Sequence, residues 1–66
     1  MGWNEQSRYG INEHEVLSVW GTGQSFVVRL DNTKNNSAYI LLESQEQDVC
    51  QRFFDLMKEA YEELIY

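Results

Sequence analysis

The sequence has no proline, one cysteine, one histidine and only five basic residues among its 66. A single cysteine excludes an internal disulfide, and one histidine with one cysteine cannot supply an ordinary zinc site. There is no apolar run of about 18 residues and no basic start followed by an apolar stretch, so we expect neither a membrane span nor a secretory signal. Without proline or a low-complexity linker, residues 1–66 are predicted to form one domain.

Acidic residues outnumber basic ones by eleven to five, and the formal net charge is −6. This charge repels nucleic acid phosphates and anionic membranes, so we expect no direct binding to either and favour a basic protein as partner. Hydrophobic residues make up 42% of the chain and aromatic residues 14%. That apolar content is typical of a folded domain, although 66 residues lie near the lower size limit for folding without metals or disulfides.

Residues 44–66 have the pattern of one amphipathic helix, because apolar side chains recur at steps of three and four. The stripe predicted to face the core consists of Val49, Cys50, Phe53, Met57, Ala60, Tyr61 and Leu64. Ser44 and Gln47 are spaced as a capping box, which predicts the helix start. Phe54 and Ile65 fall toward the edge of the stripe and are candidate partner contacts. The position of Cys50 on the stripe favours a reduced, cytoplasmic protein.

Two segments, 25–30 and 38–42, alternate between apolar and other residues as strands do. The first would direct Phe26, Val28 and Leu30 to one face, and the second would direct Ala38, Ile40 and Leu42 to one face. Turn-forming residues occupy positions 31–37 between them, which predicts an antiparallel hairpin.

The segment 15–20 allows two interpretations. Its β-branched residues, followed by turn formers at 21–24, favour a strand. The alternative is a helix, because Asn12 and Glu15 are spaced as an N-cap pair and Gly21 could end it. We prefer the strand. Residues 1–10 are polar with isolated aromatics and no period, and they are interpreted as a loose arm.

These elements predict an α+β fold: a three-stranded antiparallel sheet covered on one face by a single long C-terminal helix. The opposite sheet face is expected to carry a further apolar set, Val16, Trp20, Val27, Tyr39 and Leu41. Because a solvated face is seldom so apolar, either the N-terminal arm or another chain should cover it.

No catalytic, cofactor or metal site is expected. His14 lies between Glu13 and Glu15, but alternation along a strand would direct it away from both carboxylates. The glycine-containing segment 21–23 is too short for a phosphate-binding loop and precedes a strand where such a loop needs a helix.

The acidic side chains suggest a protein-binding surface. Carboxylates three or four residues apart on a helix lie about 5–6 Å apart, close to the spacing of neighbouring phosphates. The alternative is an ordinary solvated face, with weak pairs between Asp48 and Arg52 and between Lys58 and Glu62. The proposed acidic contacts are Asp31, Glu43, Glu46, Asp48, Asp55, Glu59, Glu62 and Glu63.

Four segments, 16–23, 26–32, 38–46 and 49–54, resemble in order and spacing the small acidic phage anti-CRISPR proteins that inhibit type II effector nucleases. That family has three antiparallel strands with helices and blocks DNA by occupying the site that reads the protospacer-adjacent motif. The resemblance implies partner contacts at Asp31, Asn32, Asn35, Asn36, Glu43 and Glu46. This sequence differs from the family at Lys34, where the family's turn is acidic. Residues 1–66 also contain no counterpart of the family's further acidic segment.

The function expected from the sequence is a non-enzymatic inhibitor, encoded by a phage or mobile element, that binds a basic nucleic-acid-handling protein in the host cytoplasm. The alternative is a self-associating structural or assembly protein of phage or bacterial origin, which would bury the apolar sheet face in a homodimer.

Overall fold

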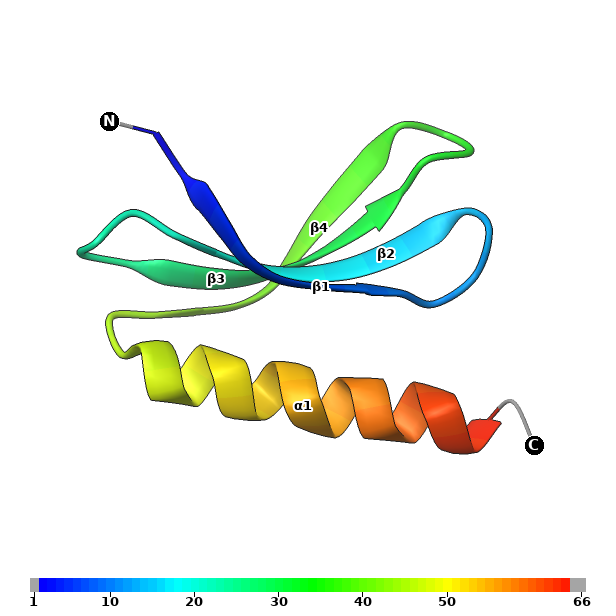
Figure 1. Cartoon of the computed structure of the whole chain (residues 1–66). Helices are drawn as coiled ribbons and strands as arrows, with labels where there is room; N and C mark the ends of the chain where they lie inside the picture. Colours follow the sequence, from blue (N-terminus) through cyan, green and yellow to red (C-terminus); the bar gives the residue numbers. More distant parts are fainter. Residues whose placement is uncertain (1, 65–66) are drawn as a thin grey trace.

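Four strands and one helix follow one another along the chain in the computed structural model, which describes residues 2–64 (Figure 1). The strands form one antiparallel sheet in sequence order, and the helix packs against one of its faces. The fold is therefore α+β, as predicted, with four strands where the sequence predicted three. The elements are β1 (Asn4–Gly10), β2 (Glu15–Gly21), β3 (Phe26–Asn32), β4 (Ser37–Ser44) and α1 (Gln47–Leu64).

The additional strand, β1, lies where the sequence analysis placed a loose arm. It pairs with β2, with an irregularity between Glu5 and Ser7. Its polar sequence conceals the strand because part of its contact with the helix layer is polar: the Ser7 hydroxyl donates to Gln51 Oε1 at 3.0 Å. Tyr9 supplies an apolar contact with the core. The three-strand prediction is corrected by this strand.

The segment 15–20 is a strand, as preferred, although the hydrogen bonds of the rival interpretation also form. Asn12 Oδ1 accepts from the backbone N–H groups of His14 and Glu15, at 2.8 and 3.0 Å. These bonds close the loop between β1 and β2 and do not begin a helix. Leu17 and Val19 are fully buried on the helix-facing side of β2, so tertiary packing decides for the strand.

The core forms where α1 crosses β2 and β3. Its buried members are Leu17, Val19, Val28, Cys50 and Phe54. The helix is rotated from the predicted phase: Phe54 is 4% exposed, whereas Val49 is 41% and Leu64 is 79% exposed. Phe53 and Met57 pack at the margin of the core. Phe54 is thus a core residue and not an edge residue, and Val49, Ala60 and Leu64 are corrected to exposed positions. Ile65 lies outside the described residues.

The start of α1 also differs from the prediction. Ser44 ends β4, and its hydroxyl accepts from the backbone N–H of Glu46 at 3.0 Å. The Gln47 side chain donates instead to Gln6 Oε1 in β1. The reciprocal capping box is therefore absent, and the helix begins at Gln47. Among residues 2–64, no helix is long and apolar enough to cross a membrane.

A bulge in β4 changes which way its side chains face. Val28 pairs with Leu42, but the next residue of β3, Arg29, pairs with Ile40, so Leu41 is an extra residue in β4. Ile40 consequently lies on the face of Arg29, opposite to that of Leu42. The prediction that Ile40 and Leu42 share one face is wrong, because one inserted residue reverses the alternation.

Candidate interaction surfaces

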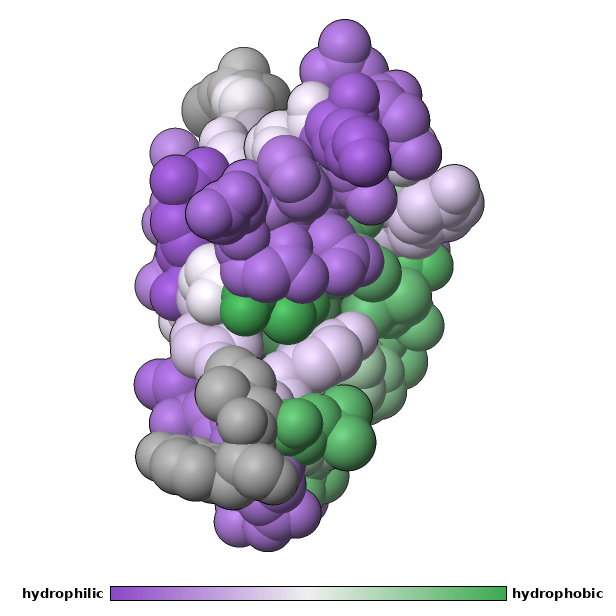
Figure 2. Space-filling view, turned by 90° about the vertical axis from the view of Figure 1, so that its right-hand side faces the viewer, coloured by the Kyte–Doolittle hydropathy of each residue, from purple (hydrophilic) through white to green (hydrophobic). Residues whose placement is uncertain are grey.

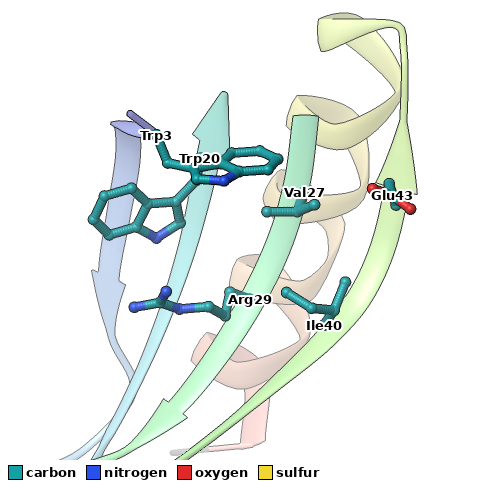
Figure 3. Close-up of a pocket in the computed structure, with 6 residues that line it drawn as sticks. All are labelled: Trp3, Trp20, Val27, Arg29, Ile40 and Glu43. Atoms are coloured by element: carbon teal, nitrogen blue, oxygen red, sulfur yellow. The ribbon is translucent and has the colours of Figure 1, made fainter. Parts of the chain in front are cut away.

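The sheet face away from α1 contains a hollow that we call the outer groove. It has a volume of about 470 Å³ and is lined by Trp3, Trp20, Val27, Arg29, Ile40 and Glu43. These residues come from the segment before β1 and from β2, β3 and β4, so the groove crosses the sheet. Figure 3 shows the two indole rings together at one end, Val27 in the middle and Glu43 at the other end.

The position of Trp20 is fixed by its neighbours on this face. The indole Nε1–H donates to Ser18 Oγ at 2.8 Å, and Ser18 is only 1% exposed. The Arg29 guanidinium carbon lies 4.9 Å from the centroid of the Trp20 ring, within the range of a cation–π contact. Trp20 therefore forms a fixed wall of the outer groove.

Arg29 and Asp31 form a two-pronged ion pair. Arg29 Nε lies 2.7 Å from Asp31 Oδ1, and Nη2 lies 2.8 Å from Oδ2. The hydrogen bond to Asp31 raises the pKa of Arg29 above its ordinary value. Asp31, predicted as a free acidic contact, is therefore largely neutralised by a residue of its own strand.

Glu43 occupies a different electrostatic position. It pairs with Val27 across the sheet, on the outer face, and its side chain is exposed. Within residues 2–64 it has no ion pair, whereas Arg8 and Arg29 are paired with Glu5 and Asp31. Glu43 is thus the carboxylate of this face that stays uncompensated.

The remaining acids lie in the helix layer or just before it. All are exposed: Glu46, Asp48, Asp55, Glu59, Glu62 and Glu63. The weak pairs considered for Arg52 and Lys58 are absent among the described residues. Lys58 lies instead 5.6 Å from the centroid of the Tyr9 ring. The acidic helix face, defined by Asp55, Glu59, Glu62 and Glu63, forms no ion pair within residues 2–64, and Asp55 accepts a hydrogen bond from the uncharged Gln51 side chain at 3.1 Å.

The predicted asparagine contacts lie at the tip of the β3–β4 hairpin, where they also shape the turn. Asn32 Oδ1 accepts from the Lys34 N–H at 2.9 Å, and Asn35 Oδ1 accepts from the Ser37 hydroxyl at 2.6 Å. Asn36 has a φ of 54°, a conformation that asparagine tolerates better than most residues. Their identities are therefore explained by turn geometry.

The two edges of the sheet differ in character. β1 carries Glu5 and Arg8, whose side chains form an ion pair at 3.2 Å. The other edge strand, β4, exposes Tyr39 (59%), Ile40 (57%) and Leu41 (38%). Figure 2 shows hydrophobic surface along one side of the molecule, beside hydrophilic residues.

The structure divides the predicted contacts into three places. Asp31 and Glu43 lie on the outer sheet face, the asparagines lie at the hairpin tip, and the helix acids lie in the other layer. Sequence reasoning placed Trp20 and Val27 on the outer face but missed the groove. The sequence did not indicate that Trp3 and Ile40 line this groove. Trp3 precedes a strand that was not predicted, and Ile40 faces outward only because of the bulge in β4.

Among residues 2–64, no three or more side chains of the usual metal-ligating types converge. Cys50 is fully buried, and removal from water raises the pKa of its thiol.

Comparisons with protein-family models, curated proteins and solved structures found no match to this chain.

Proposed function

We propose that this chain is a non-enzymatic protein-interaction domain that inhibits a basic, nucleic-acid-handling host protein by imitating DNA, as phage anti-CRISPR proteins do. The acidic helix face is the docking surface. Its partner would be a CRISPR effector or another enzyme with a positively charged nucleic acid groove. The protein would act in the host cytoplasm, without a cofactor.

The observation that carries the proposal is the charge of α1. Its last turn contains acidic residues and no basic residue, although the helix dipole disfavours negative charge at that end. Arg52 and Lys58 do not form ion pairs with these acids among the described residues. Stability alone does not favour such an arrangement, whereas recognition by a basic surface does.

The resemblance to the anti-CRISPR proteins supports the same class of partner. The β2–β3–β4 meander followed by α1 has the strand, turn and helix order on which the resemblance rests. The neutralised Asp31 and the turn-forming asparagines argue that, in this chain, recognition depends more on α1 than on the hairpin tip.

Reversing the charge of the acidic helix face is expected to abolish partner capture. With Asp55, Glu59, Glu62 and Glu63 changed to lysine, affinity for the captured partner should fall by about tenfold or more, because attraction becomes like-charge repulsion. The measurement is pull-down from a bacterial lysate at low salt, followed by a salt wash and by biolayer interferometry on the recovered protein. Capture of wild type should favour basic nucleic-acid enzymes and weaken with salt.

Two controls make this test specific to position. The single variant Glu59→Lys is compared with the control variant Glu13→Lys. Glu13 is an exposed acid in the β1–β2 loop, so both variants change the net charge by the same amount. The Glu59→Gln/Glu63→Gln variant should melt at the wild-type temperature or slightly higher, because a like-charge pair near the helix end is removed. Equal loss of capture with Glu13→Lys, or no bias toward basic enzymes, would refute DNA imitation.

A second candidate function is self-association, which the exposed apolar side chains of β4 favour. An edge strand presents unpaired backbone groups, and natural proteins usually protect it with lysine, proline or shortening. β4 spans eight residues, Ser37–Ser44, with neither lysine nor proline among them. Pairing of two β4 strands would join two sheets and cover Tyr39, Ile40 and Leu41.

Self-association predicts a dimer at tens of micromolar protein that persists in high salt. Tyr39→Lys should convert it to a monomer, because a charge at this edge opposes strand pairing. Gln24→Lys, which places the same charge in the β2–β3 turn, should not. Light scattering coupled to size-exclusion chromatography measures both. A wild-type monomer under these conditions would exclude obligate assembly.

A further inference from the structure

The outer groove offers a site for a guest side chain that is separate from the acidic helix face. Its volume of about 470 Å³ falls within the range of about 300–1,000 Å³ typical of ligand sites. Val27 is 7% exposed and forms its floor, while Trp3 and Ile40 remain 47% and 57% exposed at its rim. An apolar floor with exposed rim residues suits a long side chain with an aliphatic stem.

The charges of the outer face determine what that guest should carry. Of the carboxylates that residues 2–64 place on the outer sheet face, Glu5 and Asp31 are engaged by Arg8 and Arg29, whereas Glu43 has no ion pair. Because Glu43 lies at one end of the groove and the two indole rings lie at the other, a cation placed between them meets a carboxylate and an aromatic wall (Figure 3). Both attract positive charge.

The protein already contains one example of this recognition. Arg29 stacks on Trp20 while its guanidinium is held by two carboxylate oxygens. Trp3 and Glu43 provide an aromatic ring and a carboxylate of the same kinds on the same face, and the cation that lines the groove among residues 2–64, Arg29, is already bound to Asp31 and Trp20. Arginine suits them better than lysine, because its planar guanidinium stacks on rings and binds carboxylates through two N–H groups.

We propose that the outer groove binds an arginine side chain of the partner protein, with its guanidinium at Glu43 and its stem over Val27 beside Trp3. This inference rests on the proposed function, since it names a second contact with the same basic partner. The domain would then engage its partner through both layers: a broad electrostatic contact on α1 and one inserted arginine on the sheet.

The test uses a probe in place of the partner: the peptide acetyl-Gly-Gly-Arg-Gly-Gly-amide, titrated into the full-length ¹⁵N-labelled chain. The two tryptophans give two indole N–H signals, and Trp3→Phe assigns them. The Trp3 signal should shift and saturate with arginine peptide. A citrulline peptide of the same shape but without charge should leave it unmoved, and a lysine peptide should bind more weakly.

Glu43→Gln should weaken arginine-peptide binding about fivefold, which corresponds to about 1 kcal/mol at 25 °C. Glu63→Gln, which removes the same charge from the helix layer, should not weaken it. A spectrum that stays dispersed shows that Glu43→Gln is folded. Equal shifts with citrulline, or equal affinity in Glu43→Gln, would overturn the inference.

The proposal for the outer groove and the proposal for the acidic helix face can be refuted independently of each other. The fourfold lysine variant of the helix face should retain arginine-peptide binding, because none of its substitutions lines the groove. If that variant loses partner capture while wild type shows no groove binding, the groove inference fails and the proposed function stands. If groove binding is normal but helix reversal leaves capture unchanged, the proposed function fails instead.

Discussion

Phe54→Ala is expected to cost about 3–5 kcal/mol of unfolding free energy and to leave much of the protein unfolded at 25 °C. Phe54 is 4% exposed and packs among Leu17, Val19 and Val28, so truncation would leave a cavity where α1 meets the sheet. At roughly 0.05–0.15 kcal/mol per residue, a 66-residue domain has only about 3–10 kcal/mol in total.

Urea denaturation followed by circular dichroism at 222 nm measures this effect. The matched control is Leu56→Ala on the same helix, where the side chain is 62% exposed and the expected change is about 0.5 kcal/mol or less. Phe54→Leu, which keeps most of the apolar volume, should restore part of the loss. A Phe54→Ala protein as stable as Leu56→Ala would show that α1 presents another face to the sheet.

Gly21→Ala is expected to destabilise the domain by about 1–3 kcal/mol, although it adds a single methyl group. A Cβ at position 21 would lie 2.6 and 2.7 Å from Phe26 Cδ1 and Cε1 and 2.8 Å from Gln6 Nε2. Phe26 pairs directly with Gly21 across β2 and β3, and its ring packs against the core, so it has little freedom to withdraw.

The control is Gly10→Ala, because nothing lies within 4 Å of the Cβ it would add. That change should be neutral or stabilise by up to about 1 kcal/mol, since alanine restricts the unfolded chain more than glycine does. Both variants are compared by chemical denaturation under the same conditions. If the two alanines had equal effects, the close approach of the Phe26 ring to Gly21 would not limit packing.

The predictable part of the fold is the part in which apolar residues repeat with a period. β3 and the helix show such repeats, whereas the sequence of β2 fits both a strand and a helix, and burial of Leu17 and Val19 against the helix layer decides for the strand. β1 could not be found this way. It is held by backbone pairing with β2 and by the hydroxyl of Ser7, neither of which produces an apolar pattern.

The rotation of the helix shows a different limit. Phe53 and Phe54 are adjacent and both apolar, so the helical period alone admits either as the centre of the buried stripe. The choice is made by the sheet, where Val19 and Val28 contact the stripe that contains Cys50 and Phe54. Sequence periodicity therefore predicts that a helix is amphipathic more reliably than it predicts which residue is central.

The candidate site was predictable in its charges but not in its shape. The exposure of the helix acids follows from their spacing, and the structure places them as expected on the surface. The outer groove depends on the bulge, on the ion pair that holds Arg29 and on Trp3. The bulge and Trp3 bring together segments that are distant in the sequence, and the alternation of β3 does not reveal that Arg29 pairs with Asp31 two residues away.

The extra residue in β4 has a consequence for how the sequence of this domain can change over generations. Removing Leu41 would leave Leu42 opposite Val28 and Ile40 opposite Arg29, so every other side chain of the strand would keep its side of the sheet. A deletion elsewhere in β4 would instead shift the pairing and turn apolar residues outward. The strand therefore tolerates deletion of residue 41 better than deletion of its neighbours. A gap in an alignment of related sequences is most readily accommodated at that position.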